Sequence, residues 1–467
     1  MTLTIVGLGR GHIDDLSRRA WRALENARNV YLRTTSHPAV PHLPPSARYI
    51  SLDDTQDGVE RVLDVAKLED VVYAVPGDPM VGDATVTRLL ALANDAGITV
   101  KIVNGISFVE PALKLLGVNA LDGLQVLDGA AVAAMHHPPI NPDLPALLAH
   151  VSRENASEVK RVLLNQYPDE FEVTLLHSIG TDEARIERLA LRDLDQRAPL
   201  SAVLFVPALG GMASFQRFEE IIAHLRAPEG CPWDRKQIHE SLRPYLIEEA
   251  YEVLEAIDNG DWQALSEELG DVMLQAVLHT QIAVDHGEFR MTDVLRHINN
   301  KLVRRHPHVW GDTQVSGAEQ VLANWDTLKQ QEHAEKGTAR ESLLDGVPKG
   351  LPALMQTYQY RQKAAKIGFD WEKVEDVEAK VREELEEVVN AKDAEQMFEE
   401  MGDLLFALVN WAHWLGVKDP ESALREANAK FYRRFRYIEA QLNGKTDEQY
   451  PIAQLEVLWN EAKAKGL

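Results

Sequence analysis

Short apolar runs alternate with amphipathic stretches over roughly the first 210 residues of the chain. Several runs have the length and composition of buried strands, and a stretch with helical periodicity lies at 83–96. The predicted strands are 3–6, 70–75, 99–103, 173–176 and 202–206. Strands that alternate with helices predict an α/β domain with a largely parallel sheet, in which ligands bind beyond the carboxyl ends of the strands.

The pattern changes at about residue 215. We find no strand-like run beyond this point, and long amphipathic stretches such as 242–257 predict helices. The segment 332–352 is polar and contains Gly and Pro, which is typical of a linker. The sequence therefore predicts a multidomain chain, with an α/β domain at 1–212 and two all-α helical-bundle domains at 216–335 and 345–467.

The all-α part contains an internal repeat. Three motifs return in the same order, and Trp325 has a counterpart in Trp459. The motifs are Glu-Glu-x-x-Glu at 248–252 and 383–387, Glu-x-x-Asp at 268–271 and 400–403, and Lys-x-x-Arg-Arg at 301–305 and 430–434. This order indicates two copies of one helical unit.

The repeated acids are candidate metal ligands. Glu248, Glu249 and Glu252 fall within an arc of about 100° on a helix, and for this motif alone a solvated acidic face is the simpler interpretation. Glu268 and Asp271 change the balance, because they stand in a helix so apolar that we expect it to be buried on most sides. A buried carboxylate is costly unless it is paired or bound to metal. Two such helices can converge four carboxylates on one point.

The second copy repeats this arrangement with Glu383, Glu384, Glu387, Glu400 and Asp403. Oxygen ligands without histidine favour Mg²⁺ or Mn²⁺ over zinc. Gly270 and Gly402 lie in mid-helix between the acids, at a cost of about 1 kcal/mol relative to Ala. They predict the close approach of a neighbouring helix or a ligand.

Basic helices follow the acids in both copies, and they are candidates for phosphate binding because Arg matches phosphate oxygens. The alternative is a set of ion pairs with the abundant acids. The basic residues are Lys301, Arg304, Arg305, Lys430, Arg433 and Arg434. Trp325 and Trp459 are candidates for stacking on a base, although each also fits a core or interface anchor.

The overall charge restricts the partners. The 49 basic and 73 acidic residues give a net charge of −24, which argues against nucleic acid as the main ligand. The single cysteine, Cys231, cannot form an intrachain disulfide, which fits a reducing compartment. We see neither a signal peptide nor an apolar run of about 18 residues, so we expect a cytoplasmic protein without a membrane partner.

The order of the acidic and basic motifs over 216–467 resembles the MazG family of nucleoside triphosphate pyrophosphohydrolases. The resemblance implies a homodimeric enzyme that hydrolyses an NTP or dNTP to the monophosphate and pyrophosphate, to clear unwanted nucleotides. It implies that Glu248 and Glu383 position or deprotonate the water and that the basic residues clamp phosphates. The implied Mg²⁺ ligands are Glu249, Glu252, Glu268 and Asp271 in the first copy, and Glu384, Glu387, Glu400 and Asp403 in the second.

The first part of the chain resembles a tetrapyrrole (corrin/porphyrin) methylase, which binds S-adenosylmethionine. The resemblance rests on three loops that follow predicted strands, with Arg10 and His12 replacing the family's Pro and Asp. The loop residues are Gly7, Gly9, Gly11, Gly77, Asp78, Pro79, Gly105 and Ser107. Three hypotheses stay open, one for this domain and two for the whole protein. The domain is a scaffold without the chemistry, the protein is an S-adenosylmethionine-dependent methyltransferase with accessory helices, or it is a non-catalytic dimer that senses nucleotides.

Overall fold

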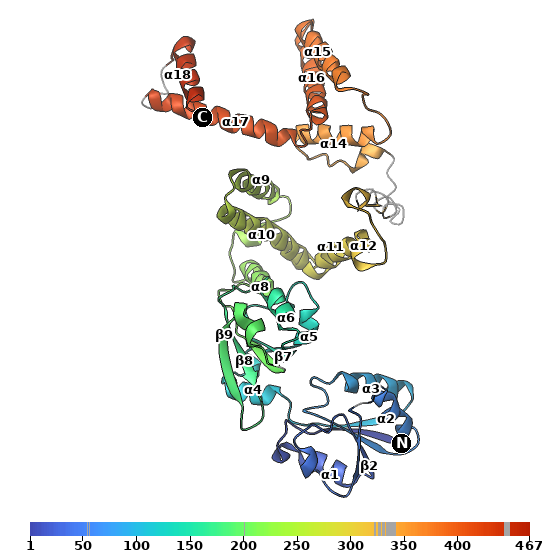
Figure 1. Cartoon of the computed structure of the whole chain (residues 1–467). Coiled ribbons are helices and arrows are strands. Elements are labelled where there is room, and N and C mark those ends of the chain that lie inside the picture. Colours follow the sequence, from blue (N-terminus) through green and yellow to red (C-terminus); the bar gives the residue numbers. More distant parts are fainter. Residues whose placement is uncertain are drawn as a thin grey trace. The chain divides into compact units, whose positions relative to one another are not determined.

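The computed structural model describes the chain except for residues 54, 56, 200, 322–323, 326–327, 329–331, 333–341 and 443–448. The chain forms two compact units, Met1–Val294 and Leu295–Leu467. Figure 1 shows two sheets followed by helices along the chain. None of the described helices is long and apolar enough to cross a membrane.

The first sheet is entirely parallel, with the strand order β3-β2-β4-β1-β5. Its strands are β1 (Thr2–Gly7), β2 (Asn29–Leu32), β3 (Arg48–Ser51), β4 (Val71–Val75) and β5 (Thr99–Val103). Helices α2 (Gly58–Ala66) and α3 (Ala84–Asp95) pack in one core with Leu3, Ile5 and Tyr73, whereas α1 (Arg18–Glu25) packs in another with Val6. Burial on both faces explains why the central strands β1 and β4 read as continuous apolar runs.

The second sheet is mostly antiparallel, so the prediction of a largely parallel sheet is correct only for the first. The strand order is β6-β7-β10-β8-β9, and only β6 and β7 run parallel. The strands are β6 (Gln125–Asp128), β7 (Ala146–Val151), β8 (Glu172–His177), β9 (Arg185–Ala190) and β10 (Ala202–Val206). The intervening helices are α4 (Val109–Leu116), α5 (Gly129–Ala133), α6 (Ala156–Leu163) and α7 (Leu194–Arg197). The short β8–β9 hairpin is what allows neighbouring strands to run in opposite directions.

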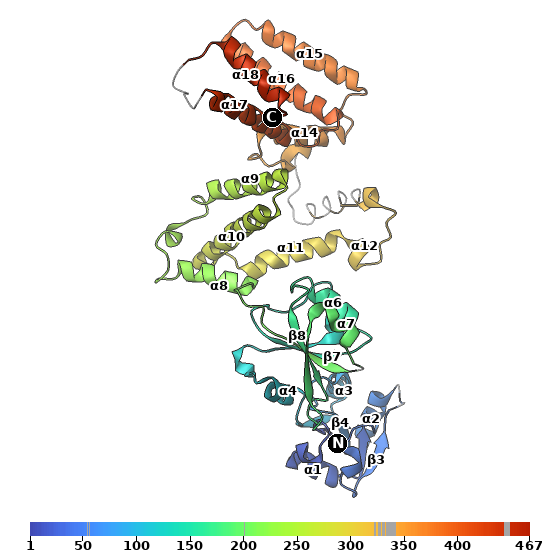
Figure 2. The same cartoon turned by 60° about the vertical axis from the view of Figure 1, so that its left-hand side comes forward.

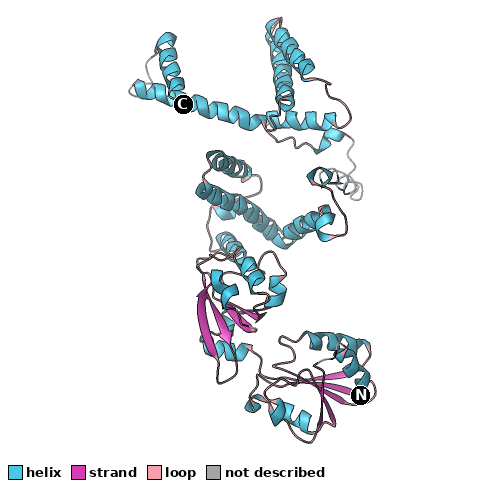
Figure 3. Ribbon diagram, viewed as in Figure 1, coloured by secondary structure: helices cyan, strands magenta, loops and turns pink. Residues whose placement is uncertain are grey.

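The rest of the chain is helical, and the described residues after β10 include no strand, as predicted (Figure 3). The helices are α8 (Phe215–Arg226), α9 (Arg243–Asn259), α10 (Trp262–His286), α11 (Met291–Arg305), α12 (Pro307–Trp310), α14 (Ala353–Ala365), α15 (Val374–Val389), α16 (Ala394–Trp414), α17 (Pro420–Gln441) and α18 (Ile452–Ala464). Of the predicted linker 332–352, residues 333–341 lie outside the described residues.

The helices pair as hairpins. Helix α9 packs on α10, α15 on α16, and α17 on α18, and Figure 1 shows α14 at the base of the α15–α16 hairpin, where α17 begins. Figure 2 shows the same chain from another side, with α9 and α10 as two neighbouring rods.

The acidic helices are less buried than the sequence predicts. In α10, Leu269 is 48% exposed, and in α16 Phe398 is 84% exposed. A Cβ added at Gly270 or Gly402 would meet nothing within 4 Å. The expected burial on most sides is therefore wrong for a single chain, because the apolar residues here exceed what one hairpin partner can cover.

Candidate metal centres

Each acidic hairpin brings three carboxylates together. On α9 and α10, ligand atoms of Glu249, Glu252 and Glu268 all lie within 4.8 Å of one another. On α15 and α16, the same holds for a second set of three, which is Glu384, Glu387 and Glu400. Antiparallel pairing places the end of one helix opposite the start of the next, so motifs about 20 residues apart in sequence meet in space.

Local sequence fixes these hairpins. Gly260 ends α9 in the left-handed conformation at φ 65°, and Asp261 caps α10 by accepting from the amides of Gln263 and Ala264. In the second hairpin, Asp393 caps α16 through the amide of Gln396. The caps set where each helix begins and therefore which acids face the partner helix.

The electrostatics of the first cluster suit a cation. Burial, followed by the carboxylates of Glu252 and Asp271, raises the pKa of both Glu249 and Glu268. Asp271 thus lies close enough to act on the cluster, although it is not one of the three carboxylates that come together. Crowded carboxylates make a set of hard oxygen donors that a divalent ion would neutralise.

The second cluster contains a cation of its own. Lys380 Nζ lies 2.7 Å from Glu383 and 2.9 Å from Glu384, and Glu384 is only 6% exposed. Burial, and then Glu384 and Glu400, raise the pKa of Glu387. The corresponding position of the first copy is Tyr245, at the same offset of 135 that relates the Glu pairs. The two repeats therefore differ in how their acids are balanced.

A pocket of about 160 Å³ opens beside the second cluster. Its wall includes Trp371 and the side chain of Asn410, which is 5% exposed and whose Oδ1 has no hydrogen-bond partner among the described residues. A buried amide without a partner marks a place where a ligand can bind. The lining residues are Arg361, Trp371, Val377, Lys380, Glu384, Asp403, Phe406, Ala407 and Asn410.

The basic residues of the first copy differ in their surroundings. Arg304 and Arg305 both pair with buried Glu332, at 2.6 Å and 2.5 Å, and Arg305 holds the pKa of that carboxyl at about 2. The ion-pair alternative thus describes these two residues. Lys301 is exposed on α11.

In the second copy, Lys430 and Arg433 are exposed on α17. Arg434 donates to the carbonyl of Leu467 at 2.8 Å and stands over the ring of Trp459 at 5.4 Å. Trp325 lies 5.5 Å from the ring of His306. Both tryptophans are therefore engaged by neighbouring side chains of the same chain.

The three predicted glycine loops of the first sheet meet at one edge. Strand β1 lies between β4 and β5, all parallel, so the loops that follow them are neighbours. Gly9 and Gly77 exchange backbone hydrogen bonds of 3.2 Å and 2.7 Å. A Cβ at Gly105 would lie 2.2 Å from the carbonyl oxygen of Gly77 and 3.0 Å from the Cα of Gly7. The glycines are needed because backbone packs directly on backbone.

Polar side chains hold the same loops. Asp78 is buried before buried Pro79, and its carboxylate accepts from the amides of Met80 and Gly105. Ser107 donates to Glu110 at 2.6 Å. Beside the loops, a pocket of about 850 Å³ is lined by Gly11, His12 and Ile106, among others. The predicted loop residues are thus together, at the edge of a cavity.

Comparison with known proteins gives three domain matches. The models are the tetrapyrrole (corrin/porphyrin) methylases at 2–195, the MazG nucleotide pyrophosphohydrolase domain at 237–310, and phosphoribosyl-ATP pyrophosphohydrolase at 351–431. The uncharacterized protein YabN of Bacillus subtilis is 39% identical, over 99% of this chain and 98% of its own. The nucleoside triphosphate pyrophosphohydrolase/pyrophosphatase MazG of Thermotoga maritima is 46% identical, over 53% of this chain and 95% of its own. The chain belongs to the MazG family.

Its N-terminal part is also similar to a solved structure, the uroporphyrin-III-C-methyltransferase of Thermus thermophilus. The identity is 24% and the TM-score 0.38, over 45% of this chain and 94% of that one. The methylase-like domain and the MazG-type helices predicted from the sequence are therefore both present in this MazG-family chain.

Sequence reasoning missed part of the second MazG-type site. Lys380 could have been found, because it precedes Glu384 by four residues and thus shares its helix face. Asn410 follows Asp403 by seven residues and shares its face in the same way. Arg361 and Trp371 come from other parts of the chain, and no spacing could have linked them to the acids.

Proposed function

We propose that the chain is a Mg²⁺-dependent nucleoside triphosphate pyrophosphohydrolase that converts an NTP or dNTP to the monophosphate and pyrophosphate. The observation that carries the proposal is the pair of three-carboxylate clusters, one on each helical hairpin. The relatives named for this activity support it. Removal of unwanted nucleotides in the cytoplasm is the role that we propose.

The donor sets fit Mg²⁺ or Mn²⁺, because they are carboxylates, and burial followed by neighbouring acids raises the pKa of Glu249, Glu268 and Glu387. The proposed ligands are Glu249, Glu252, Glu268 and Asp271, and in the second copy Glu384, Glu387, Glu400 and Asp403. When bound, the metal supplies neutralisation of phosphate oxygens and activation of water.

Side chains of the protein would orient the water and bind the phosphates. Glu248 and Glu383 would orient the water or accept its proton, and Glu383 already accepts from Lys380. Lys430 and Arg433 would bind phosphate oxygens, together with Lys301 in the first copy. Arg304 and Arg305 would first have to leave Glu332. Arg434, Trp325 and Trp459 remain candidates for substrate contact.

We propose a homodimer formed by the helical part, together with the three-domain division at 1–212, 216–335 and 345–467. The support is the large apolar surface that the hairpins leave exposed, including Met401 and Leu405 on α16. Contiguous exposed apolar surface marks protein–protein contact sites.

The deciding experiment measures pyrophosphate release from a panel of NTPs and dNTPs with Mg²⁺. Wild type is compared with Glu252→Gln, Glu387→Gln and the double variant, and loss of a metal ligand is expected to cost at least about 100-fold in the working copy. Glu378→Gln is the matched control, because Glu378 pairs with Arg382 elsewhere on α15. If wild type releases pyrophosphate and one of the metal-ligand variants does not, the nucleotide-sensing alternative is also eliminated. No release from any nucleotide would overturn the proposal.

A methyltransferase is the second candidate, favoured by the 850 Å³ pocket beside Gly11 and Ile106. This volume lies within the range of small-molecule sites. Titration calorimetry with S-adenosylmethionine, for wild type and Asp78→Asn, tests it. If wild type binds S-adenosylmethionine and Asp78→Asn does not, the result supports this candidate. If wild type shows no heat of binding, the candidate is removed.

A further inference from the structure

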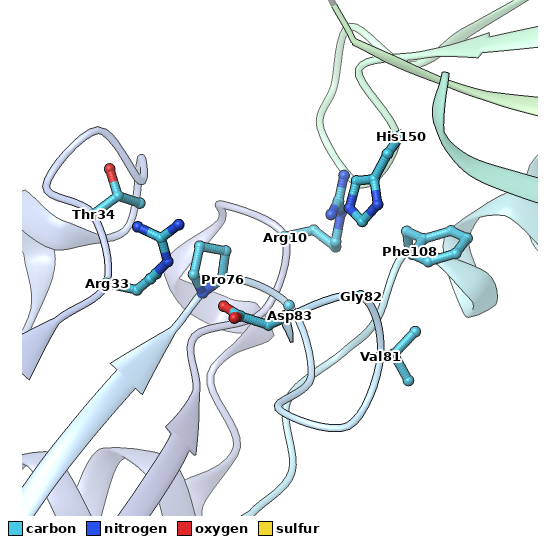
Figure 4. A pocket seen from close by; sticks show the side chains of 10 residues that line it. Arg10, Arg33, Thr34, Pro76, Val81, Gly82, Asp83, Phe108 and His150 are labelled. Atoms are coloured by element: carbon cyan, nitrogen blue, oxygen red, sulfur yellow. The ribbon is translucent and has the colours of Figure 1, made fainter. Parts of the chain in front are cut away.

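A second, smaller pocket of about 320 Å³ lies in the α/β part, at the edge where the parallel strands end. Arg10 follows β1, Arg33 and Thr34 follow β2, and His150 comes from β7 of the other sheet. Figure 4 shows Arg33 and Thr34 on one side of the pocket and Phe108 and His150 on the other. Both sheets thus contribute to one cavity, at the position where open parallel sheets bind ligands.

Two guanidinium groups line this pocket without carboxylate partners. Arg10 donates through Nε to the carbonyl of Ile179 at 3.3 Å, and its stem packs on Gly180, where a Cβ would lie 2.4 Å from the Arg10 Cβ. Burial lowers the pKa of Arg10, as expected for a charge removed from water. Neither Arg10 nor Arg33 forms an ion pair with any described residue. Their positive charge is therefore available to a ligand.

His150 faces the same space in a strained backbone. Its φ is 55°, in the left-handed region, although it lies within β7. Its Nδ1 lies 3.2 Å from Asp128, and its Nε2 would be 3.7 Å from a Cβ at Gly82. Residues held in such conformations cluster at ligand sites. His150 is thus a lining residue that the strand holds in an uncommon conformation.

The acid that lines the pocket is already engaged. Asp83 caps α3 by accepting from the amide of Thr85 at 2.8 Å, and it also accepts from the Thr85 hydroxyl at 2.5 Å. Val81 and Phe108 add apolar surface. The cavity thus offers two guanidiniums and an imidazole beside a short apolar wall, at a volume near the lower end for small-molecule sites. The Thr34 hydroxyl already accepts from the amide of Ser36 at 3.2 Å.

We propose that this pocket binds the phosphate group of a small phosphorylated compound through Arg10 and Arg33. Two guanidinium forks match the oxygens of a phosphate, and the apolar wall leaves room for a sugar-sized body. A cationic ligand such as a sulfonium is disfavoured by the same charges. The site is separate from the acidic hairpins and does not depend on the function proposed for them.

The test uses the full chain in EDTA, so that no metal-bound anion forms at the acidic clusters. Calorimetry with inorganic phosphate and with ribose 5-phosphate is run on wild type, Arg10→Met, Arg33→Met and the control Arg19→Met, an exposed residue of α1. We expect wild type and Arg19→Met to bind ribose 5-phosphate alike, and each pocket variant to bind at least about tenfold more weakly.

Arg33 is exposed, so Arg33→Met should fold even if Arg10→Met does not, and near-ultraviolet circular dichroism checks both. Unchanged affinity in Arg33→Met would overturn the proposal, as would absence of binding by wild type. Binding of S-adenosylmethionine that Arg33→Met leaves unchanged, without binding of either phosphate compound, would assign the domain to the methyl donor instead.

Discussion

Within each acidic cluster, the carboxylates repel one another. The pKa values of Glu249, Glu268 and Glu387 are all raised, in each case first by burial and then by neighbouring acids. A raised folded-state pKa means that the stability linked to these groups is present at low pH and is lost as pH rises through the raised value. A bound cation would offset the repulsion between these carboxylates.

As the pH is lowered, metal affinity should therefore begin to fall at a higher pH than it would with ordinary glutamate ligands, whose pKa is 4.5. Each ligand must lose its proton before it binds the ion, so protonation competes with metal. Titration of the full chain with Mn²⁺ at several values between about pH 5 and pH 8 measures this. A flat affinity across that interval would contradict the expectation.

Lys380 distinguishes the second cluster at the level of one side chain. It donates hydrogen bonds to Glu383 and Glu384, which raise its pKa, so it stays charged and competes with a metal. We expect Lys380→Met to bind Mn²⁺ about two- to fivefold more tightly, in proportion to a half-exposed ion pair. Arg382→Met, which removes an ion pair on the exposed face of α15, is the control. Weaker binding in Lys380→Met would instead show that the lysine positions Glu384.

Among the elements, the parallel sheet edge depends on glycine. Gly7, Gly77 and Gly105 pack backbone to backbone at the ends of β1, β4 and β5. These contacts hold three loops in one place with no side chain between them. A substitution there must move a strand end rather than a side chain.

Gly105→Ala should destabilise the α/β part by about 1–3 kcal/mol, as expected for overpacking in a closed site. Gly58→Ala is the control, since its Cβ would meet Leu52 at an ordinary 3.6 Å. Thermal unfolding followed by circular dichroism compares the two. Equal midpoints for both variants would contradict the tight packing at Gly105.

The sequence predicts the strands whose apolar residues form one continuous buried run, as at β1, β4 and β10. It also predicts β5, although that strand lies at a sheet edge and is largely exposed, and it misses β2 and β7, although both are mostly buried. Strand β9 carries Arg185, Glu187 and Arg188 at the sheet edge, and its alternation is obscured by charge. The acids of both hairpins follow from helical spacing, whereas the pocket beside Asp403 needs residues that only tertiary packing brings together.

For the molecule as a whole, burial is uneven. The α/β part has four closed apolar cores, whereas the described helices of Leu295–Leu467 leave residues such as Phe398, Leu405 and Phe431 exposed. A second copy of the chain is the occupant that we propose for this surface.

Leu405→Glu should convert the proposed dimer to a monomer and lower pyrophosphate release, because a charge at a buried contact costs several kcal/mol, on the order of 2–5. Sedimentation velocity of both proteins measures the change. Leu68→Glu is the control, since Leu68 is 76% exposed in the α/β part. A wild type that sediments as a monomer at every concentration would remove the dimer from the proposal.

The exposed helical surface also has a consequence for biosynthesis. A new chain can complete its α/β part as soon as that part leaves the ribosome, since its cores need no second molecule. In the proposed dimer, the helical part would finish only after two chains meet, so its completion would be second order in chain concentration. Until then, a cellular protease would cut the helices first and leave the α/β part intact. The rate of synthesis would therefore decide what fraction of new chains survives to become active.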